Sequence, residues 1–448
     1  MNYDAAVKYL LSLGRELAAP TQAAAAKFDL ENITVLAERL GQPQRAYPSA
    51  HIAGTNGKGS TGAFLESILR AAGLRTGLNT SPHLEKINER IRINGIEISD
   101  AQFADVLTRI RSTIEVLLAE GKLRAHPTYF ECVTAMAFQH FSQEHIDFGV
   151  FEVGLGGRLD ATNILQPKIC IITRIDFDHE NFLGHSLREI AGEKAGILKA
   201  GVPVVVAEQL PEARDVIFAK ADELGCPIIS ASDAYTIRRE SSDADGRVHA
   251  DIADNSSDWS TSVEIPLSGR FQLQNALNAV AAARLLSTQG FPISDDAIRN
   301  GVAATQWPGR LEKLQSHPDV YLDGAHNPSA ARELATFWKE NLPGRRIILI
   351  YAALRDKAID EVAGLLFPHA AEVILTEPRT SRAISATQLA EIVGHHAALS
   401  SIHPDGEAAF QHALAIAQPS DAIFVTGSLY LVGQLRHYWK QRSQVAAK

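Results

Sequence analysis

Short apolar runs alternate with amphipathic stretches along almost the whole chain. Runs rich in valine, isoleucine and phenylalanine recur as "FGVFEVGLGG", "KICIITRIDFDH", "GVPVVVAE", "VYLDGAHN", "RRIILIY", "AEVILTEPR" and "DAIFVTGS". Each run is short and lies between segments whose apolar residues have helical spacing, which is typical of buried parallel strands. The pattern therefore predicts an α/β fold with a mostly parallel sheet that helices cover on both faces.

Two breaks in this rhythm indicate how the chain is divided. The polar stretch 238–262 predicts a surface region of short β segments, with Asp245-Gly246 as a candidate turn. Further on, Pro308-Gly309 interrupts the pattern before a second series of strands and helices begins at Val320. A chain of 448 residues is long enough for about two or three domains. We predict a larger domain at 1–305 and a smaller, Rossmann-like α/β domain at 306–448.

The stretch "SAHIAGTNGKGSTGAFLESILRAAG" places a glycine-rich turn between an apolar run and a helical pattern. Gly57, Lys58, Gly59 and Ser60 then lie at a helix N-terminus, where unpaired N–H groups favour an anion. Lys58 adds a positive charge and Ser60 a hydroxyl suited to Mg²⁺, so the pattern favours a P-loop for nucleotide phosphates. Its spacing departs from the general P-loop pattern, because Gly54 lies only four residues before Lys58. A purely structural turn is the alternative.

Polar residues follow the apolar runs at several points. Glu152 ends one run, His179 follows the next, and Ser81 lies in the short segment "LNTSPHL" after another expected strand. Ligands of open α/β sheets collect at the carboxyl ends of strands, and these groups next to a phosphate loop suit Mg²⁺ coordination. The alternatives are a helix cap or ion pair for Glu152 and an ordinary hydrogen-bonded histidine for His179.

Composition and charge restrict the class of partner and the compartment. The formal net charge of −9 gives no general attraction to nucleic acid or to an anionic membrane. The three cysteines (Cys132, Cys170 and Cys226) have no metal-binding spacing, and a disulfide framework is not expected. The N-terminal segment lacks the pattern of a signal peptide, and no apolar run is long enough for a membrane span. We expect a cytoplasmic protein.

A set of short motifs carries a resemblance to a known family. The chain contains, in order, "GTNGKGS", "TSPHL", "NERIRI", "PTYFE", "FEVGLGGRLDATN", "DHENFLG", "EKAGILK", "FQLQNA", "WPGRLE", "DGAHNP" and "TGSL". In this it resembles the folylpolyglutamate synthase/dihydrofolate synthase family, which belongs with the Mur ligases. The resemblance runs from about Asp29 to the last expected strand. It implies that 1–305 is an ATP-binding, Mur-ligase-like domain with a pterin site and that 306–448 is a glutamate-ligase domain.

The resemblance implies an ATP-dependent ligase that adds L-glutamate to reduced folates, and also to 7,8-dihydropteroate, through an acyl phosphate. The implied partners are these small molecules alone, and the expected oligomeric state is a monomer. A Mur-type ligase acting on a UDP-sugar peptide is the nearest enzyme alternative, yet only about fifty residues precede "GTNGKGS", where that class has a further domain. A P-loop switch without ligase chemistry is the other alternative; it has no need for "DGAHNP" or Lys194.

The resemblance also implies a role for individual residues. The expected ATP contacts are Gly57, Lys58, Gly59, Ser60, Asn275, Arg310 and Asp323. The expected ligands of two Mg²⁺ ions are Ser81 and Glu152 for the first and His179 for the second. Glutamate and transferred phosphate are expected to meet His326, Ser428 and Arg90, and the pterin side is expected to include Thr128, Tyr129, Phe130, Arg158 and Asp160. Lys194 resembles a lysine that CO₂ carbamylates, which requires a neutral amine and therefore burial.

Overall fold

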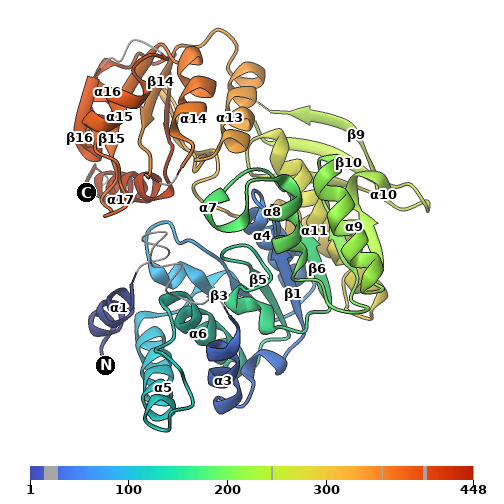
Figure 1. Cartoon of the computed structure of the whole chain (residues 1–448). Coiled ribbons are helices and arrows are strands. Elements are labelled where there is room, and N and C mark those ends of the chain that lie inside the picture. Colours follow the sequence, from blue (N-terminus) through green and yellow to red (C-terminus); the bar gives the residue numbers. More distant parts are fainter. Residues whose placement is uncertain (15–28, 244–245, 356, 397–400, 447–448) are drawn as a thin grey trace.

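The fold is built on two large sheets, one in each part of the chain (Figure 1). The computed structural model describes residues 1–14, 29–243, 246–355, 357–396 and 401–446. The first sheet has eight strands in the order β4-β3-β2-β5-β1-β6-β7-β8, and all neighbours from β2 to β8 are parallel. Its strands are β1 (Ser49–Ala53), β2 (Thr76–Asn79), β3 (Ile91–Ile93), β4 (Ile96–Glu97), β5 (Phe148–Glu152), β6 (Ile169–Ile172), β7 (Val204–Val206) and β8 (Ile228–Ser230).

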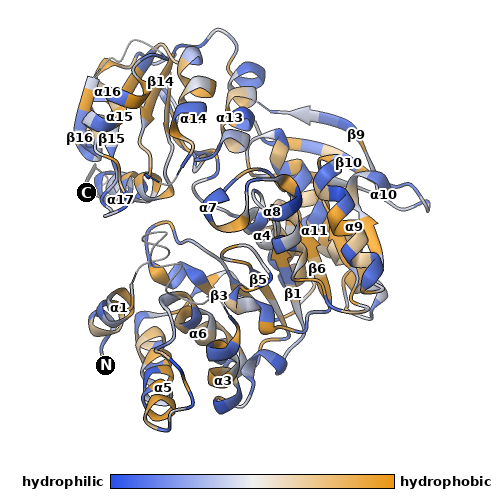
Figure 2. Ribbon diagram, in the orientation of Figure 1, coloured by the Kyte–Doolittle hydropathy of each residue, from blue (hydrophilic) through white to orange (hydrophobic). Residues whose placement is uncertain are grey.

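Helices cover both faces of this sheet, as the alternating pattern predicts. They are α1 (Tyr3–Ser12), α3 (Glu31–Arg39), α4 (Lys58–Ala71), α5 (Asp100–Ala119), α6 (Tyr129–Gln143), α7 (Glu180–Leu183), α8 (Leu187–Ala195), α9 (Pro211–Glu223), α10 (Ala231–Ala234), α11 (Arg270–Thr288) and α12 (Asp295–Ala303). Along β1, Ile52 joins the core under α4 and α11, whereas Ala53 joins the core under α8 and α9. Successive strand residues point to opposite faces, so one apolar strand supplies two cores. Apolar residues accordingly gather on the strands in Figure 2.

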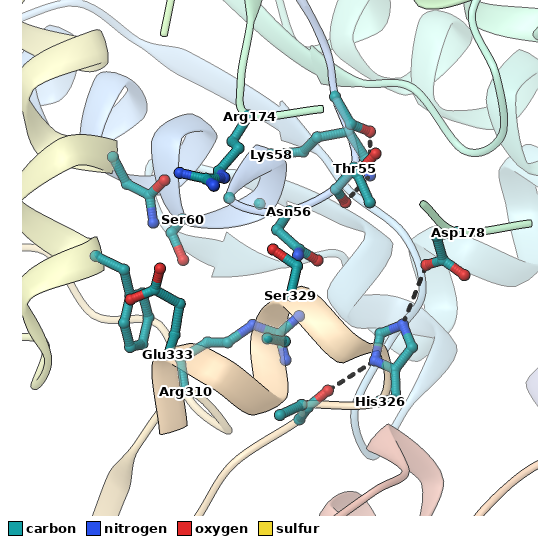
Figure 3. A pocket seen from close by; sticks show the side chains of 18 of the residues that line it. Thr55, Asn56, Lys58, Ser60, Arg174, Asp178, Arg310, His326, Ser329 and Glu333 are labelled. Carbon is teal, nitrogen blue, oxygen red and sulfur yellow. Dashed lines mark hydrogen bonds and ion pairs between the residues drawn. The ribbon is translucent and has the colours of Figure 1, made fainter. Parts of the chain in front are cut away.

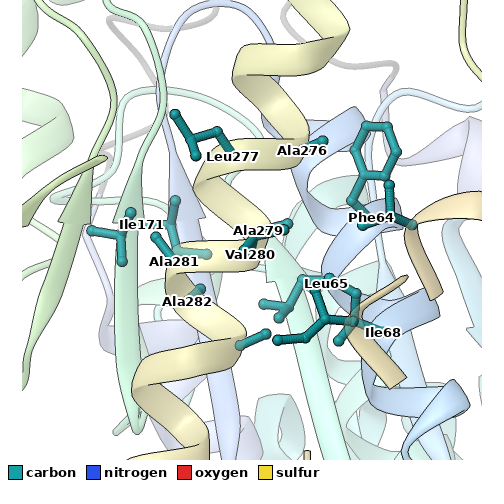
Figure 4. Close-up of a cluster of buried hydrophobic side chains, with 14 of the residues drawn as sticks. Phe64, Leu65, Ile68, Ile171, Ala276, Leu277, Ala279, Val280, Ala281 and Ala282 are labelled. Carbon is teal, nitrogen blue, oxygen red and sulfur yellow. The ribbon is translucent and has the colours of Figure 1, made fainter. Parts of the chain in front are cut away.

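Small side chains let α4 and α11 lie close together. Figure 4 shows Phe64 and Leu65 of α4 beside Ala276 and Ala279 of α11, and all four side chains are fully buried. Alanine side chains project only a short distance from the helix, so the two backbones approach closely and dispersion contacts are dense. This packing fixes the N-terminus of α4, where the glycine-rich turn lies.

The polar stretch forms the predicted region of short strands. β9 (Tyr235–Ser242), β10 (Val248–Asp254) and β11 (Ser260–Ile265) make an antiparallel sheet of their own. Asp245 of the predicted turn lies outside the described residues.

The second sheet has six strands in the order β12-β13-β17-β14-β15-β16 and is parallel apart from β12. Its elements are β12 (Glu312–Gln315), β13 (Asp319–Leu322), α13 (Pro328–Asn341), β14 (Ile347–Tyr351), α14 (Ile359–Leu366), β15 (Glu372–Glu377), α15 (Ala386–Val393), β16 (Ser401–Asp405), α16 (Gly406–Ile416), β17 (Ala422–Thr426) and α17 (Leu429–Ala446). The α/β class with a second, smaller sheet-containing part is confirmed. No helix in the described part of the chain combines the length and apolar character that crossing a membrane requires.

Helix α17 also packs against the first part of the chain. Its Arg436 bridges Glu312 and Glu85, and Lys440 Nζ lies 2.7 Å from Glu85 Oε1. A Cβ atom at Gly433 would lie only 1.8 Å from the Leu84 carbonyl oxygen, so the helix backbone rests directly on this loop. The two parts are therefore held together beside the cleft between them.

A buried histidine in β1 predicts a pH-dependent stability. His51 Nε2 lies 2.8 Å from Thr162 Oγ1, while Nδ1 has no hydrogen-bond partner among the described residues, and burial lowers the pKa of His51 to about 3. Below the ordinary histidine pKa the unfolded chain binds a proton that the folded chain does not, so stability falls as the pH falls. Between about pH 7 and about pH 5.5, the free energy of unfolding of the wild type should fall by about 1 kcal/mol more than that of His51→Gln. Urea unfolding at the two pH values measures this difference.

The exposed His249, on β10, provides the control for this experiment. His249→Gln, which changes an exposed histidine and leaves the buried His51 in place, should leave the pH dependence of the wild type unchanged. An identical slope for wild type and His51→Gln would contradict the prediction.

Candidate active site

A cavity of about 470 Å³ lies where the carboxyl ends of the first sheet face the loops of the second part. The first part contributes the turn 54–60, Ser81, the segment 152–156, Asp178, His179 and Lys194. The second part contributes Arg310, the segment 323–326, Ser329 and Glu333 (Figure 3). Residues far apart in the sequence therefore meet in one space, at the edge where open α/β sheets bind ligands.

The glycine-rich turn leads directly from β1 into α4. Gly57 has a φ of 87°, and a Cβ atom there would lie 2.2 Å from Asn275 Oδ1; at Gly59 it would lie 2.9 Å from the Trp307 ring. Only glycine fits both positions without a shift of these neighbours. The four orphan N–H groups at the start of α4 thus open onto the cavity beside Lys58 and Ser60.

Lys58 folds back over its own turn. Its Nζ donates to the carbonyl oxygens of Gly54 and Thr55, each at 3.1 Å, and these bonds are drawn in Figure 3. Burial lowers the pKa of Lys58, an effect that Glu152 and Asp178 oppose. A partly buried ammonium group in the cavity lining suits an anion such as a phosphate.

Glu152 ends β5 and lies beside Ser81. Its Oε2 accepts a hydrogen bond of 3.0 Å from the Ser81 backbone N–H, whereas Oε1 accepts none from the described residues. Burial raises the pKa of Glu152, and the nearby Lys58 opposes this. A buried carboxylate with one open oxygen, next to a hydroxyl, is the hard-oxygen donor set that Mg²⁺ prefers, so these residues fit the predicted ion.

Asp178 joins the two parts of the chain. Its Oδ1 lies 2.7 Å from Lys357 Nζ, and its Oδ2 lies 3.7 Å from His326 Nε2 and accepts from Asn327 Nδ2 at 3.3 Å. Burial alone would raise the pKa of Asp178, but Lys357 and His326 hold this pKa well below its ordinary value. Asn327 also exchanges amide hydrogen bonds with Asn56 of the glycine-rich turn. These contacts place the second part over the cavity.

His179 lies next to this ion pair and directly precedes the short helix α7. Its Nε2 is 3.5 Å from Lys357 Nζ, and burial, together with that lysine, lowers the pKa of His179 to about 3. The imidazole is therefore neutral at physiological pH and has a lone pair to offer a metal ion.

Lys194 lies in the last turn of α8 and is 5% exposed. Its Nζ donates to the Gly54 carbonyl oxygen at 2.8 Å, which brings it to the base of the glycine-rich turn. Burial, helped by Lys58, lowers the pKa of Lys194 to about 7. A large share of this amine is therefore neutral near pH 7, which is the condition for carbamylation.

Arg310 and Asp323, two of the residues predicted to contact the nucleotide, line the cavity from the second part. Asp323 follows β13 and accepts backbone hydrogen bonds of 2.9 Å from Leu311 and from Ala325. Burial raises the pKa of Asp323, and Arg310 opposes this from across the cavity wall. His326 Nδ1 lies 2.7 Å from the Gly324 carbonyl oxygen, which leaves Nε2 directed at Asp178 (Figure 3). Asn275 lines the cavity from α11.

Several predicted residues do not line this cavity. Thr128, Tyr129, Phe130, Arg158, Asp160, Arg90 and Ser428 are absent from its lining, as far as the structure describes the chain. Arg90 is buried, with Nε 2.9 Å from His83 Nδ1 and its guanidinium 5.5 Å from the Tyr129 ring centre. Ser428 is also buried and accepts a 3.2 Å hydrogen bond from the Tyr430 N–H at the start of α17.

Local contacts account for most of the other side chains in this set. Asp160 accepts from the Gly154, Leu155 and Thr162 N–H groups and so holds the loop after β5 in shape. Thr128 forms a capping box with Glu131 at the start of α6. Arg158 Nη2 pairs with Glu193 at 2.8 Å in a largely exposed position.

Sequence reasoning also missed groups that the fold brings to the cavity. Arg174 and Glu333 line the cavity, whereas Lys357 and Asn327 line a neighbouring pocket that also contacts Asp178. Burial raises the pKa of Glu333, and Arg174 opposes this. The sequence held no signal for these contacts, because each partner comes from a different part of the chain.

Two segments of the chain match known domain families. The Mur ligase middle domain matches residues 52–283, and the glutamate ligase domain of Mur ligases matches residues 309–429. A Bacillus subtilis dihydrofolate synthase/folylpolyglutamate synthase is 38% identical over 90% of this chain and 92% of its own length. The chain belongs to the folylpolyglutamate synthase/dihydrofolate synthase family. The resemblance seen in the motifs is thereby confirmed.

Solved structures of this family share the fold. A Mycobacterium tuberculosis folylpolyglutamate synthase complexed with ADP has a TM-score of 0.88 and 31% identity, covering 98% of this chain and 99% of the other. An Escherichia coli FolC in complex with DHPP and ADP has a TM-score of 0.86 and 30% identity, covering 99% of each chain. The family consists of ATP-dependent ligases, so a phosphate-binding switch without ligase chemistry is not supported.

Proposed function

We propose that this chain is an ATP-dependent ligase that adds L-glutamate to reduced folates and also to 7,8-dihydropteroate. The observation that carries the proposal is the shared cavity, where Lys58, Glu152 and Lys194 face Arg310 and His326 from the second part of the chain. The names of several relatives combine both activities, as in the Bacillus subtilis protein. We place the reaction in the cytoplasm, where the three buried, free cysteines stay reduced.

The chemistry requires an activated acid. A carboxylate oxygen attacks the γ-phosphorus of ATP and ADP leaves, which gives an acyl phosphate. The amine of glutamate then attacks the acyl carbon and loses a proton, and phosphate leaves as the amide forms. The protein has to align these groups and neutralise the growing phosphate charge. Lys58 and the N–H groups of α4 suit the β- and γ-phosphates, and Arg310 and Asp323 suit the nucleotide from the opposite wall.

Two Mg²⁺ ions and a carbamate complete the proposed site. Ser81 and Glu152 would hold one Mg²⁺ and His179 a second, and such ions supply positive charge to the phosphates. Lys194 is the candidate for carbamylation, in which its nitrogen bonds to the carbon of CO₂ and its proton passes to solvent. His326, with its imidazole beside Asp178, is placed to meet the incoming glutamate at the cavity wall.

Phosphate release tests the proposal directly. Purified protein should release phosphate from ATP only when both glutamate and a pteroate-type acid are present, and dihydropteroate and tetrahydrofolate should be compared as acceptors. Turnover at full rate without glutamate would overturn the ligase assignment. Turnover with a UDP-sugar peptide in place of the folate would indicate the Mur-type alternative.

The Asp178–Lys357 pair predicts a coupling between the two parts of the chain. Lys357→Met leaves the Asp178 carboxylate without its nearest cation, so we expect the contact between the two parts to weaken and kcat/KM for glutamate to fall at least about tenfold. Small-angle scattering with ATP analogue and folate should show less compaction than in the wild type. Arg332→Met, which removes an exposed pair with Glu361, is the matched control and should change neither readout. Unaltered kcat/KM in Lys357→Met would contradict the coupling.

A further inference from the structure

A second group of metal-ligand side chains lies in the C-terminal part of the chain, outside the cavity. In the described residues, one group of three histidine or acidic side chains could hold an ion: Asp360, His395 and His396, whose ligand atoms all lie within 4.8 Å of one another. Asp360 is in the first turn of α14, and the two histidines follow the end of α15. None of the three lines the active-site cavity.

The two imidazoles converge on one carboxylate oxygen. His395 Nε2 lies 3.3 Å and His396 Nε2 lies 2.8 Å from Asp360 Oδ1. Ligand atoms about 2.1 Å from a tetrahedral ion are roughly 3.4 Å apart, so small shifts are enough to admit an ion between these three groups. The side chains of Asp360 and His395 are 61% and 63% exposed, which leaves the fourth position open to water.

The packing of the second histidine orders the group before any ion binds. A Cβ atom at Gly364, one turn after Asp360 on α14, would lie 3.0 Å from His396 Cε1, so this ring rests on the helix backbone. The His395 ring lies against it, with ring centres 4.0 Å apart and planes at 38°. His396 is correspondingly only 21% exposed. Two ordered imidazoles and a carboxylate are the nitrogen and oxygen ligands that Zn²⁺ and its neighbours favour.

We propose that Asp360, His395 and His396 bind one divalent transition-metal ion, with Zn²⁺ the best match to the ligand set. The ion would tie α14 to the segment that follows α15. The site is separate from the ligase cavity, so it does not depend on the proposed reaction. The alternative is that the three residues form a surface ion pair and nothing more.

Zn²⁺ titration of the untagged, full-length protein tests the site. The titration is run by calorimetry with Mg²⁺ and a non-hydrolysable ATP analogue present, so that the active site is occupied. We expect the wild type to bind one equivalent of Zn²⁺. The His395→Ala/His396→Ala double variant should bind it at least about tenfold more weakly, because even the loss of a residue that only hydrogen-bonds a metal ligand lowers metal affinity about tenfold. Asp360→Asn, a nearly isosteric surface change, should weaken binding similarly. His249→Ala, which removes an exposed histidine elsewhere, should bind as the wild type does.

Two further readouts identify the ligands and the effect. Cu²⁺ bound at the site should give an electron paramagnetic resonance spectrum with coupling to two nitrogens, and Zn²⁺ should raise the melting temperature of the wild type more than that of the double variant. Equal Zn²⁺ binding by wild type and double variant would reduce the group to a surface ion pair. Zn²⁺ binding by Asp360→Asn as tight as in the wild type would show that the carboxylate is not a ligand and would overturn the three-ligand site.

Discussion

Replacing Lys58 with methionine should lower turnover by about 100- to 1,000-fold, because the phosphates lose the full positive charge nearest to the glycine-rich turn. The side chain is partly buried and reaches back over the turn, where it donates to the carbonyl oxygens of Gly54 and Thr55. Methionine keeps the length and the apolar stem of lysine. The loss should therefore reflect charge rather than packing. The measurement is phosphate release with saturating ATP, glutamate and folate.

Lys168→Met provides the control for this prediction. Lys168 precedes β6 and its side chain is exposed, so its loss should leave turnover within the error of the assay. Binding of a fluorescent ATP analogue to Lys58→Met should weaken, while far-ultraviolet circular dichroism should match the wild type. A rate near that of the wild type in Lys58→Met would show that the phosphates lie elsewhere.

The second large effect is expected at Lys194. Lys194→Ala should lower turnover at least about 100-fold and leave ATP binding largely intact, since the side chain contacts the base of the turn rather than its N–H groups. Lys194→Arg should fail to restore activity, because a guanidinium stays charged and cannot be carbamylated. Wild-type turnover should depend on bicarbonate, and ¹³C-labelled bicarbonate should give a carbamate carbonyl signal that is absent from both variants.

Lys199→Met is the matched control, because Lys199 is a partly buried lysine of the same region, and burial lowers its pKa as it does for Lys194. It donates to Asn163 Oδ1 at 2.8 Å and to the Asn163 carbonyl oxygen at 3.0 Å, so its loss should reduce stability without changing the bicarbonate dependence. Rates near wild type in Lys194→Ala, with no bicarbonate dependence, would remove this residue from the mechanism.

The sequence was informative where one local pattern implies one structure. Valine- and isoleucine-rich runs predicted the buried strands, and the glycine-rich turn before a helical pattern predicted the N-terminus of α4. Strand ends were equally informative: Glu152 and His179 line the same cavity because parallel strands meet at one edge. None of these inferences needed a partner from a distant segment.

Prediction was weaker where the direction of a side chain decides its role. Asp160 follows a glycine-rich loop, and that pattern is the same whether the carboxylate faces a ligand or, as here, the N–H groups of its own loop. Thr128 is different, since Thr128 and Glu131 form the T-x-x-E signature of a capping box that the sequence already contained. Lys357 had no such signal, because its partner Asp178 is in the other part of the chain.

The tight contacts of the glycine-rich turn bear on resistance to inhibitors. At Gly57 and Gly59 any larger side chain collides with Asn275 or with the Trp307 ring, and at Gly57 the backbone conformation is unfavourable as well. A compound that gains its affinity from the main chain of this turn would therefore contact a surface that point mutations cannot reshape without damaging the enzyme. Resistance would have to arise in more exposed residues of the cavity lining, such as Arg270 and Glu340.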